Sequence, residues 1–245
     1  MNRHVRRALI AVVWIGLWQG LTLLVGLPKL LPGPADTLWA WIALAGTGKF
    51  WLSVGMTLLR VAAGYLCAVG AGILLSALCW RFRAAEEFLS PVRSVIRATP
   101  VASIIILVYL WIAKGRVPVF ISFLMVLPIV WTGVQEALAG VDPQLKEMCR
   151  AYRFTKKQTA RYLYLPAVRP ALTAACVNGL GFAWKSGIAA EVIATPDLSV
   201  GKYLNDAKVY LEAADLFAWT LTVVLLSMAL ERMLKAVMRR KGEKA

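Results

Sequence analysis

The stretch DPQLKEMCRAYRFTKKQTARYLYLP, residues 142–166, is long, polar and amphipathic, and it separates two apolar runs of the chain. Asp142 is a suitable helix N-cap, and Pro143 fits a first helical turn, where a backbone N–H has no intrahelical partner to lose. Apolar side chains follow at spacings of three and four, which places them on one helical face: Leu145, Met148, Cys149 and Tyr152. We therefore predict a short surface helix here.

Apolar runs recur on both sides of this segment. The chain has 245 residues, of which 60% are hydrophobic and 17% charged, whereas a soluble domain is about half apolar and roughly a quarter charged. Six runs come close to the roughly 20 residues that a helix needs to cross a bilayer, at residues 8–27, 54–79, 95–113, 117–139, 167–194 and 214–237. These runs predict an all-α integral membrane protein of about six transmembrane helices, forming a single domain over residues 1–245.

The basic residues predict the orientation. If the N-terminus is cytoplasmic, most Lys and Arg residues fall on the inner side, around residues 3–7, 81–97, 146–169 and 232–244. The outer side then holds only Lys29, Lys49, Lys114, Arg116, Lys202 and Lys208. Because Lys and Arg are retained in cytoplasmic loops, both termini are expected inside. Topology thus explains the net charge of +15 better than nucleic-acid binding does.

Neither a catalytic nor a metal site is expected on this chain. Its only histidine is His4, in the basic N-terminal tail, and the sequence contains no HExxH or GxSxG motif. The four cysteines lack CxxC spacing, so we interpret them as small apolar residues. A GxxxxGK[ST] phosphate loop is also absent, so any ATP must be bound by another polypeptide.

Four ionisable residues lie within or near the predicted spans, where a buried charge usually faces a cavity or a partner: Arg60, Glu136, Lys185 and Glu191. We expect Glu191 to cap the outer end of its helix or to bond a neighbouring loop. Arg60 and Glu136 are expected to snorkel toward opposite membrane faces.

Lys185 shares a helical face with Asn178 and Gly181, at offsets of three, four and seven residues. A lysine and an amide on one face suit a translocation path for an anionic or hydrogen-bonding solute. The alternative is a structural ion pair between Lys185 and a glutamate on another helix.

The second span is dense in small residues, including Gly64, Gly70 and Gly72. Small side chains let two helix backbones approach closely. The pattern predicts a tight helix contact without identifying the neighbouring helix.

Within residues 142–166 the chain resembles the cytoplasmic signature of binding-protein-dependent ABC importer permeases, Glu-Ala-Ala, three residues, Gly, nine residues, Ile-x-Leu-Pro. The corresponding positions keep this spacing and are Glu147, Met148, Cys149, Arg153, Leu163, Leu165 and Pro166. Arg153 replaces a glycine that permits a sharp turn, and arginine is expected to adopt an ordinary backbone conformation there. Two prolines, Pro166 and Pro170, are expected to break the chain before the fifth span.

Further similarities extend over the chain, at residues 60–65, 97–102 and 189–193. They resemble the permease branch for nitrate, sulfonate, taurine or bicarbonate uptake, which also includes importers of thiamine-pyrimidine precursors. The resemblance implies a type I importer permease fold with a coupling helix at about residues 142–166, in the bacterial plasma membrane. Its solute would be small and polar or anionic.

The resemblance also implies partners: two ABC ATP-binding subunits that carry ATP and Mg, an extracytoplasmic solute-binding protein, and a second permease copy, with a homodimer favoured. The implied docking residues for the ATP-binding subunit are Glu147, Met148, Cys149, Arg150, Tyr152, Arg153, Phe154, Leu165 and Pro166. For this segment the alternative is a solvated helix resting on lipid headgroups. For the whole chain it is a self-sufficient secondary transporter or channel, although the sequence shows no clear internal repeat.

Overall fold

The computed structural model describes residues 3–27 and 29–242. The predicted domain limits, residues 1 and 245, and the end of the last basic segment lie outside the described residues. The described chain is helical: α1 Arg3–Val25, α2 Pro34–Ala45, α3 Gly48–Arg81, α4 Arg83–Ala98, α5 Val101–Trp111, α6 Val117–Ala139, α7 Pro143–Ala151, α8 Lys156–Thr159, the π-helix η1 Ala160–Tyr164, α9 Leu165–Ala194, α10 Val200–Val209 and α11 Ala213–Gly242.

Five of the six predicted apolar runs coincide largely with a single helix each, and the third does not. Among the described residues, α3, α6 and residues 213–238 of α11 are long and apolar enough to cross a membrane, and the bent pair α4 and α5 adds a fourth candidate. The apolar part of α1, Leu9–Val25, is shorter. The fifth predicted run is α9, a helix of 30 residues that carries both Lys185 and Glu191.

The third predicted span differs from expectation. A single helix over residues 95–113 is wrong, because α4 ends at Ala98, α5 begins at Val101, and their axes differ in direction by 106°. Proline disfavours helical backbone in the residue before it, and Thr99 accordingly has φ −79° and ψ 131°. Pro100 therefore sets the position of the bend.

The packed centre of the molecule consists of α3, α6 and α9, and glycines bring these helices together. A Cβ at Gly64 would lie 2.2 Å from the carbonyl oxygen of Val119, on α6, and one at Gly72 would lie 2.9 Å from Val130 Cβ. The predicted small-residue contact is thus confirmed, with α6 as the neighbour. Gly70 takes no part, since nothing lies within 4 Å of its Cβ position.

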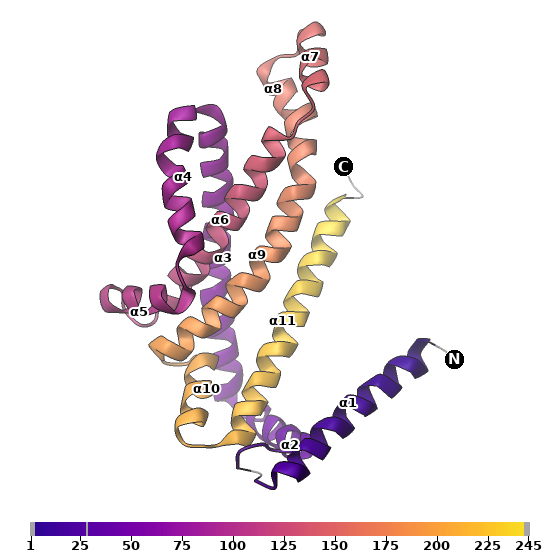
Figure 1. Ribbon diagram of the computed structural model, residues 1–245, viewed down its shortest axis with the longest axis vertical. Coiled ribbons are helices and arrows are strands. Elements are labelled where there is room, and N and C mark those ends of the chain that lie inside the picture. The colour runs from indigo at the N-terminus through magenta and orange to yellow at the C-terminus, as the bar shows by residue number, and fades with distance from the viewer. Residues whose placement is uncertain (1–2, 28, 243–245) are drawn as a thin grey trace.

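Figure 1 shows the helices that lie at the two ends of this bundle. The short helices α7 and α8 lie at one end, α2 and α10 lie at the other, and α1 diverges from the remaining helices. Between α9 and α11, residues 195–212 contain the short helix α10, Val200–Val209. On the α2 side, Trp39 and Trp51 are 72% and 60% exposed, as suits tryptophans at a membrane interface.

All four cysteines are free thiols, and three of them are buried. Cys79, Cys149 and Cys176 therefore pack as small apolar residues, whereas Cys67 is exposed.

Candidate functional site

Helix α7 begins as the sequence predicts. The Asp142 carboxylate accepts a hydrogen bond from the Gln144 backbone N–H at 2.8 Å, and Pro143 occupies the first turn. The N-cap thereby satisfies one of the backbone donors that a helix start leaves free.

The end of α7 corrects a prediction. Arg153 has φ +53°, so it adopts the left-handed conformation that glycine favours. The Phe154 N–H donates to the Cys149 carbonyl at 2.9 Å, and the Arg153 N–H donates to the Arg150 carbonyl at 3.0 Å. These two bonds form a Schellman turn, which requires a left-handed residue at this position. The turn of the signature is therefore retained although the glycine is not.

The side chains of α7 divide between an inner and an outer face. Cys149 is 3% exposed and packs in a cluster with Val141 and Leu163, so its predicted role in docking can only be to anchor the helix. The other predicted docking residues are all exposed: Glu147, Met148, Arg150, Tyr152, Arg153, Phe154, Leu165 and Pro166.

The two prolines after α7 do not break the chain. Helix α8, η1 and α9 follow one another without a gap from Lys156 to Ala194. Pro166 lies in the first turn of α9, while Pro170 lies inside that helix. The widened π turn at Ala160–Tyr164 comes immediately before them, and there the Leu165 N–H bonds the Ala160 carbonyl. The prediction of a break is wrong: helical backbone continues through both prolines, and the π turn directly before Pro166 changes the hydrogen-bonding pattern where the N–H that proline lacks would otherwise be needed.

The three residues predicted on a translocation path line one cavity of about 670 Å³, which we call the central cavity. Asn178, Gly181 and Lys185 reach it from α9. Two further α9 residues and residues from α4, the α4–α5 bend, α5, α6 and α11 complete the lining: Ile96, Arg97, Thr99, Val101, Met125, Pro128, Ile129, Val177, Phe182, Glu231 and Lys235.

The central cavity carries a net positive charge. Glu231 is its only carboxylate among the described lining residues, and it pairs with Lys235 one helical turn away at 3.3 Å. Arg97 and Lys185 form no ion pair with any described residue, so the structure does not contain the alternative glutamate partner for Lys185. The sequence analysis missed Arg97, Glu231 and Lys235, because their positions at span ends resemble ordinary cytoplasmic charges.

A second cavity of about 510 Å³ adjoins the first, and Arg97 and Asn178 line both. Its wall contains Glu136, whose side chain is exposed, and Thr132, whose buried hydroxyl has no hydrogen-bond partner in the structure. The polar lining therefore continues from α9 across to α6.

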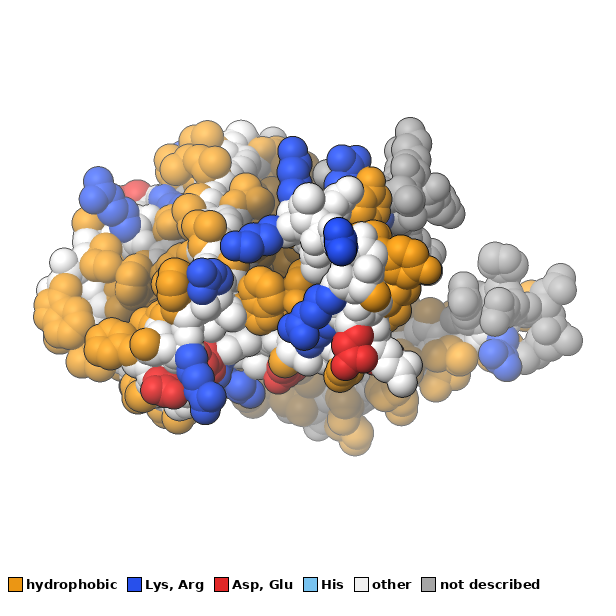
Figure 2. Space-filling view, turned by 90° about the horizontal axis from the view of Figure 1, so that it is seen from above, with side chains coloured by type: hydrophobic (Ala, Val, Ile, Leu, Met, Phe, Trp, Pro, Cys, Tyr) orange, Lys and Arg blue, Asp and Glu red, His pale blue; other side chains and the backbone are white. Residues whose placement is uncertain are grey.

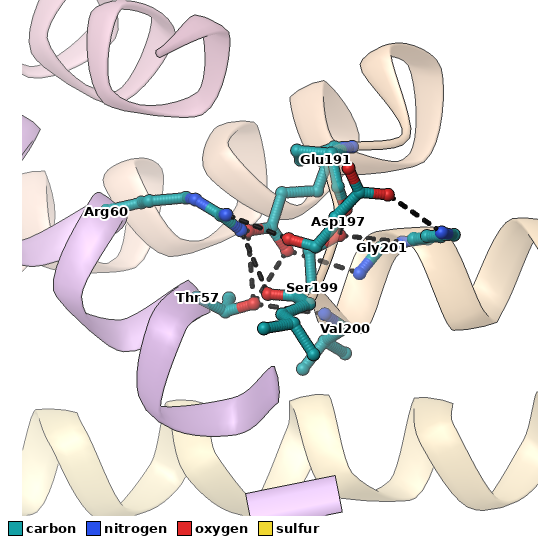
Figure 3. Close-up of polar contacts among 10 residues, drawn as sticks. Thr57, Arg60, Glu191, Asp197, Ser199, Val200 and Gly201 are labelled. Carbon is teal, nitrogen blue, oxygen red and sulfur yellow. Dashed lines mark hydrogen bonds and ion pairs between the residues drawn. The ribbon is translucent and has the colours of Figure 1, made fainter. Parts of the chain in front are cut away.

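A buried ion pair lies at the opposite end of α9 (Figure 3). Glu191 is fully buried and lies 3.2 Å from the Arg60 guanidinium. The Thr57 hydroxyl and the Gly201 N–H also donate to this carboxylate, at 2.8 and 3.2 Å. The prediction that Glu191 bonds a neighbouring segment is confirmed. Snorkelling of Arg60 is wrong, because only 11% of its side chain is exposed.

The same network holds the segment before α10. Arg60 donates to the backbone carbonyls of Asp197 and Leu198 at 2.9 and 3.1 Å. The Asp197 carboxylate also pairs with Lys114 at 2.8 Å and with Lys202 at 3.0 Å. The hydrogen bonds and charges of Lys114 and Lys202 lower the pKa of Asp197 from 3.8 to about 2. Helix α10 is thereby attached to α3 and to the α5–α6 turn.

Comparison with known proteins identifies the architecture. Residues 68–242 match the family model described as binding-protein-dependent transport system inner membrane component. The chain belongs to this family. It is therefore a multi-pass inner-membrane permease subunit of an ABC importer, and the alternative of a self-sufficient transporter or channel is excluded.

Individual relatives agree with this assignment. The chain is 26% identical over 229 residues to a Brucella melitensis protein named as a probable ABC transporter permease, covering 93% of this chain and 92% of the relative. It is 25% identical over 241 residues to the taurine transport system permease protein of Escherichia coli, covering 95% and 86%. A solved amino acid ABC transporter shares the fold, with a TM-score of 0.63 at 17% identity over 79% of this chain and 94% of that one.

Family membership gives the permease its partners. Binding-protein-dependent systems include an ATP-binding subunit and a solute-binding protein, and permeases of this family are not themselves enzymes. Both statements agree with the sequence analysis.

Proposed function

We propose that the central cavity is part of the path along which this permease carries a small anionic solute. The observation that supports it most strongly is the charge of the lining. Arg97 and Lys185 face one cavity from α4 and α9 without a carboxylate partner among the described residues. Both side chains are exposed, so these two cations would attract a passing anion.

A sulfonate, nitrate or similar oxyanion fits this lining best. Arginine offers a fork of donors that matches planar or tetrahedral oxyanions, and the Asn178 amide adds further hydrogen-bonding capacity. The similarity to a taurine permease supports a sulfonate in particular. An uncharged thiamine-pyrimidine precursor is the less favoured solute, since it brings no anionic group to the two cations.

Residues 142–166 are the proposed coupling segment for the ATP-binding subunit. Met148, Tyr152 and Phe154 are 45%, 75% and 37% exposed, and they form an apolar ridge on a helix end that projects beyond the bundle (Figure 1). Charged Glu147, Arg150 and Arg153 surround this ridge, as is usual at a docking surface. ATP and Mg would be bound by the partner subunit, one copy for each permease chain.

The proposed orientation places α7 and both termini in the cytoplasm. Figure 2 shows the α7 end of the molecule, where Lys and Arg side chains gather and acidic ones are few. Basic residues concentrate on the cytoplasmic side of membrane proteins. Helices α2 and α10, at the other end, would then face the solute-binding protein.

A homodimer is the proposed arrangement of the permease. Helix α1 diverges from the bundle (Figure 1), and apolar side chains along it are exposed, including Trp14, Leu17, Leu21 and Leu24. A second copy of this chain would cover this helix.

The path is tested by uptake of labelled taurine into proteoliposomes that hold the complete importer with its binding protein. Lys185→Ala and Arg97→Gln should each reduce the uptake rate about tenfold or more, which corresponds to a loss of about 1.4 kcal/mol of interaction with the solute. Binding-protein affinity for taurine and co-purification of the ATP-binding subunit should not change. The matched control is Arg81→Gln, which removes an exposed cation from the end of α3.

Normal uptake in both cavity variants would exclude the central cavity as the path. If no protein form transports taurine, nitrate and an aliphatic sulfonate serve as the next probes.

The coupling segment needs a separate test. Phe154→Ala and Glu147→Lys should reduce co-purification of the ATP-binding subunit while membrane insertion is preserved. The control Phe88→Ala removes the same kind of side chain from α4, where Phe88 is 79% exposed against 37% for Phe154, and it should leave co-purification intact. Undiminished association in the Phe154 and Glu147 variants would contradict docking at α7.

A further inference from the structure

The second cavity, of about 510 Å³, is lined by one cation and one carboxylate among its described residues. Arg97 comes from α4 and Glu136 comes from α6. Neither forms an ion pair with any residue in the described part of the chain, and they do not pair with each other. Opposite charges that share a cavity without meeting leave a gap, and a molecule that carries both charges can bridge it.

Helices α6 and α9, which form two walls of this cavity, pack antiparallel. A Cβ at Gly179 would lie 3.0 Å from Val126 Cγ1, and one at Gly133 would lie 3.3 Å from Ala175 Cβ. Rising residue numbers on α6 therefore face falling numbers on α9. The α6 residues that follow Gly133 lie nearer to α7 than the central cavity does.

The charged groups accordingly follow an order along the two cavities. Lys185 lines only the central cavity, Arg97 lines both cavities, and Glu136 lines only the second one. Arg97 is thus the cation that shares a cavity with the carboxylate. An anion that has moved from Lys185 to Arg97 comes within the same cavity as Glu136.

The wall of the second cavity can also accept hydrogen bonds from a cationic group. Thr132 lies one helical turn before Glu136 on the same face of α6, and its buried hydroxyl has no hydrogen-bond partner among the described residues. An ammonium group has three N–H donors, which a carboxylate, a hydroxyl and the side-chain oxygen of Asn178 can accept. Small residues such as Gly133 and Ala174 line the same cavity and leave room for a short apolar linker between two charges.

We propose that the second cavity selects solutes that carry an ammonium group as well as an anion, and that Glu136 recognises the ammonium group. The anion would contact Arg97, while the Thr132 hydroxyl would share the ammonium group with Glu136. This inference rests on the proposed function, because it takes the anion path as given. It adds a substrate class, a short dipolar solute such as an aminoalkanesulfonate. A plain oxyanion is disfavoured, since the same carboxylate repels it.

Saturation-transfer NMR tests this selection on the complex of the permease with its ATP-binding subunit in nanodiscs, without the binding protein. The probes are taurine, which carries both charges, and ethanesulfonate, which lacks the ammonium group. The unaltered complex should bind taurine about fivefold more strongly than ethanesulfonate, the effect of one partly exposed ion pair. Glu136→Gln should abolish this preference by weakening taurine binding alone. The matched control is Glu87→Gln, which removes an exposed carboxylate of α4 outside both cavities and should keep the preference.

Two further variants make the outcome decisive. Glu136→Asp keeps a carboxylate and should retain part of the preference, which also shows that the altered cavity folds. Arg97→Gln should weaken the binding of both probes, because both carry the anion. Equal binding of the two probes by the unaltered complex, or an unchanged preference in Glu136→Gln, would overturn the role of Glu136 and leave the anion path standing. Binding of both probes that Arg97→Gln does not alter would instead contradict the proposed function.

Discussion

Replacing Arg153 by glycine should strengthen the turn that ends α7. A left-handed conformation costs a non-glycine residue about 1–2 kcal/mol, and Arg153 has φ +53°. Glycine removes this cost, but it also makes the unfolded chain more flexible, which lowers stability by about 0.5–1 kcal/mol. The expected net gain is therefore about 0.5–1 kcal/mol for Arg153→Gly.

Hydrogen exchange of two amides measures this gain directly. The Phe154 and Arg153 N–H groups close the turn, with bonds of 2.9 and 3.0 Å to the Cys149 and Arg150 carbonyls. After correction for intrinsic rates, a gain of about 0.5–1 kcal/mol slows exchange of the amides at 153 and 154 about two- to fivefold. Exchange in the peptide over residues 149–157 can be followed by mass spectrometry.

Arg153→Ala is the matched control, since alanine loses the guanidinium but keeps the backbone cost. Its exchange should equal that of the unaltered protein. Equal exchange in the glycine and alanine variants, or faster exchange with glycine, would refute the idea that Arg153 holds a strained turn. Co-purification of the ATP-binding subunit then separates the backbone from the side chain, because a docking role for the guanidinium predicts the same loss in both variants.

Three other predictions concern stability, measured as the thermal unfolding temperature of the purified protein. Glu191→Gln should lower the free energy of unfolding by about 3–5 kcal/mol, because it leaves the buried Arg60 side chain without its counter-charge. The double variant with Arg60→Gln should recover part of this stability. Equal destabilisation by the single and double variants would argue against the ion pair. Gly64→Ala should lower the free energy of unfolding by about 1–3 kcal/mol, because its Cβ would lie 2.2 Å from a carbonyl oxygen. An unchanged unfolding temperature would show that the α3–α6 contact is not tight. Lys114 and Lys202 lower the pKa of Asp197 from 3.8 to about 2, so the ion pairs of Asp197 stabilise the fold fully above pH 3.8 and lose this effect as the pH falls toward 2. The unfolding temperature should therefore fall over this pH range, and Asp197→Asn should abolish the fall. A fall retained in Asp197→Asn would assign it to another group.

The helical elements could be predicted from the sequence because they depend on local pattern. The N-cap at Asp142 and the positions of α6 and α9 follow from residue type and from apolar run length, and all of these agree with the structure. The common face of Asn178, Gly181 and Lys185 likewise needs only helical spacing, and these residues do line one cavity.

The features that the sequence did not predict depend on contacts between segments that are distant in the chain. Arg97 and Glu231 lie near span ends, and only the bend at Pro100 and the packing of α11 against α9 bring them to the central cavity. Thr57 carries no charge, so nothing in its sequence context marked it as a ligand of Glu191. The left-handed conformation of Arg153 was not predicted, because a residue other than glycine ordinarily prefers a negative φ. In the structure, the two hydrogen bonds that close the turn after α7 impose the left-handed conformation.

The glycine contacts within the centre of the bundle have a mechanical consequence. A Cβ at Gly64 would collide with α6, and one at Gly187 would lie 2.6 Å from Val61 Cγ2 on α3. Sliding by one residue, about 1.5 Å, would push bulkier side chains into spaces that only hydrogen atoms now occupy. Helices α3, α6 and α9 therefore resist shear against one another. If the ATP-binding subunit docks at α7 as proposed, a movement delivered there would be carried along the roughly 45 Å length of α9 toward α10.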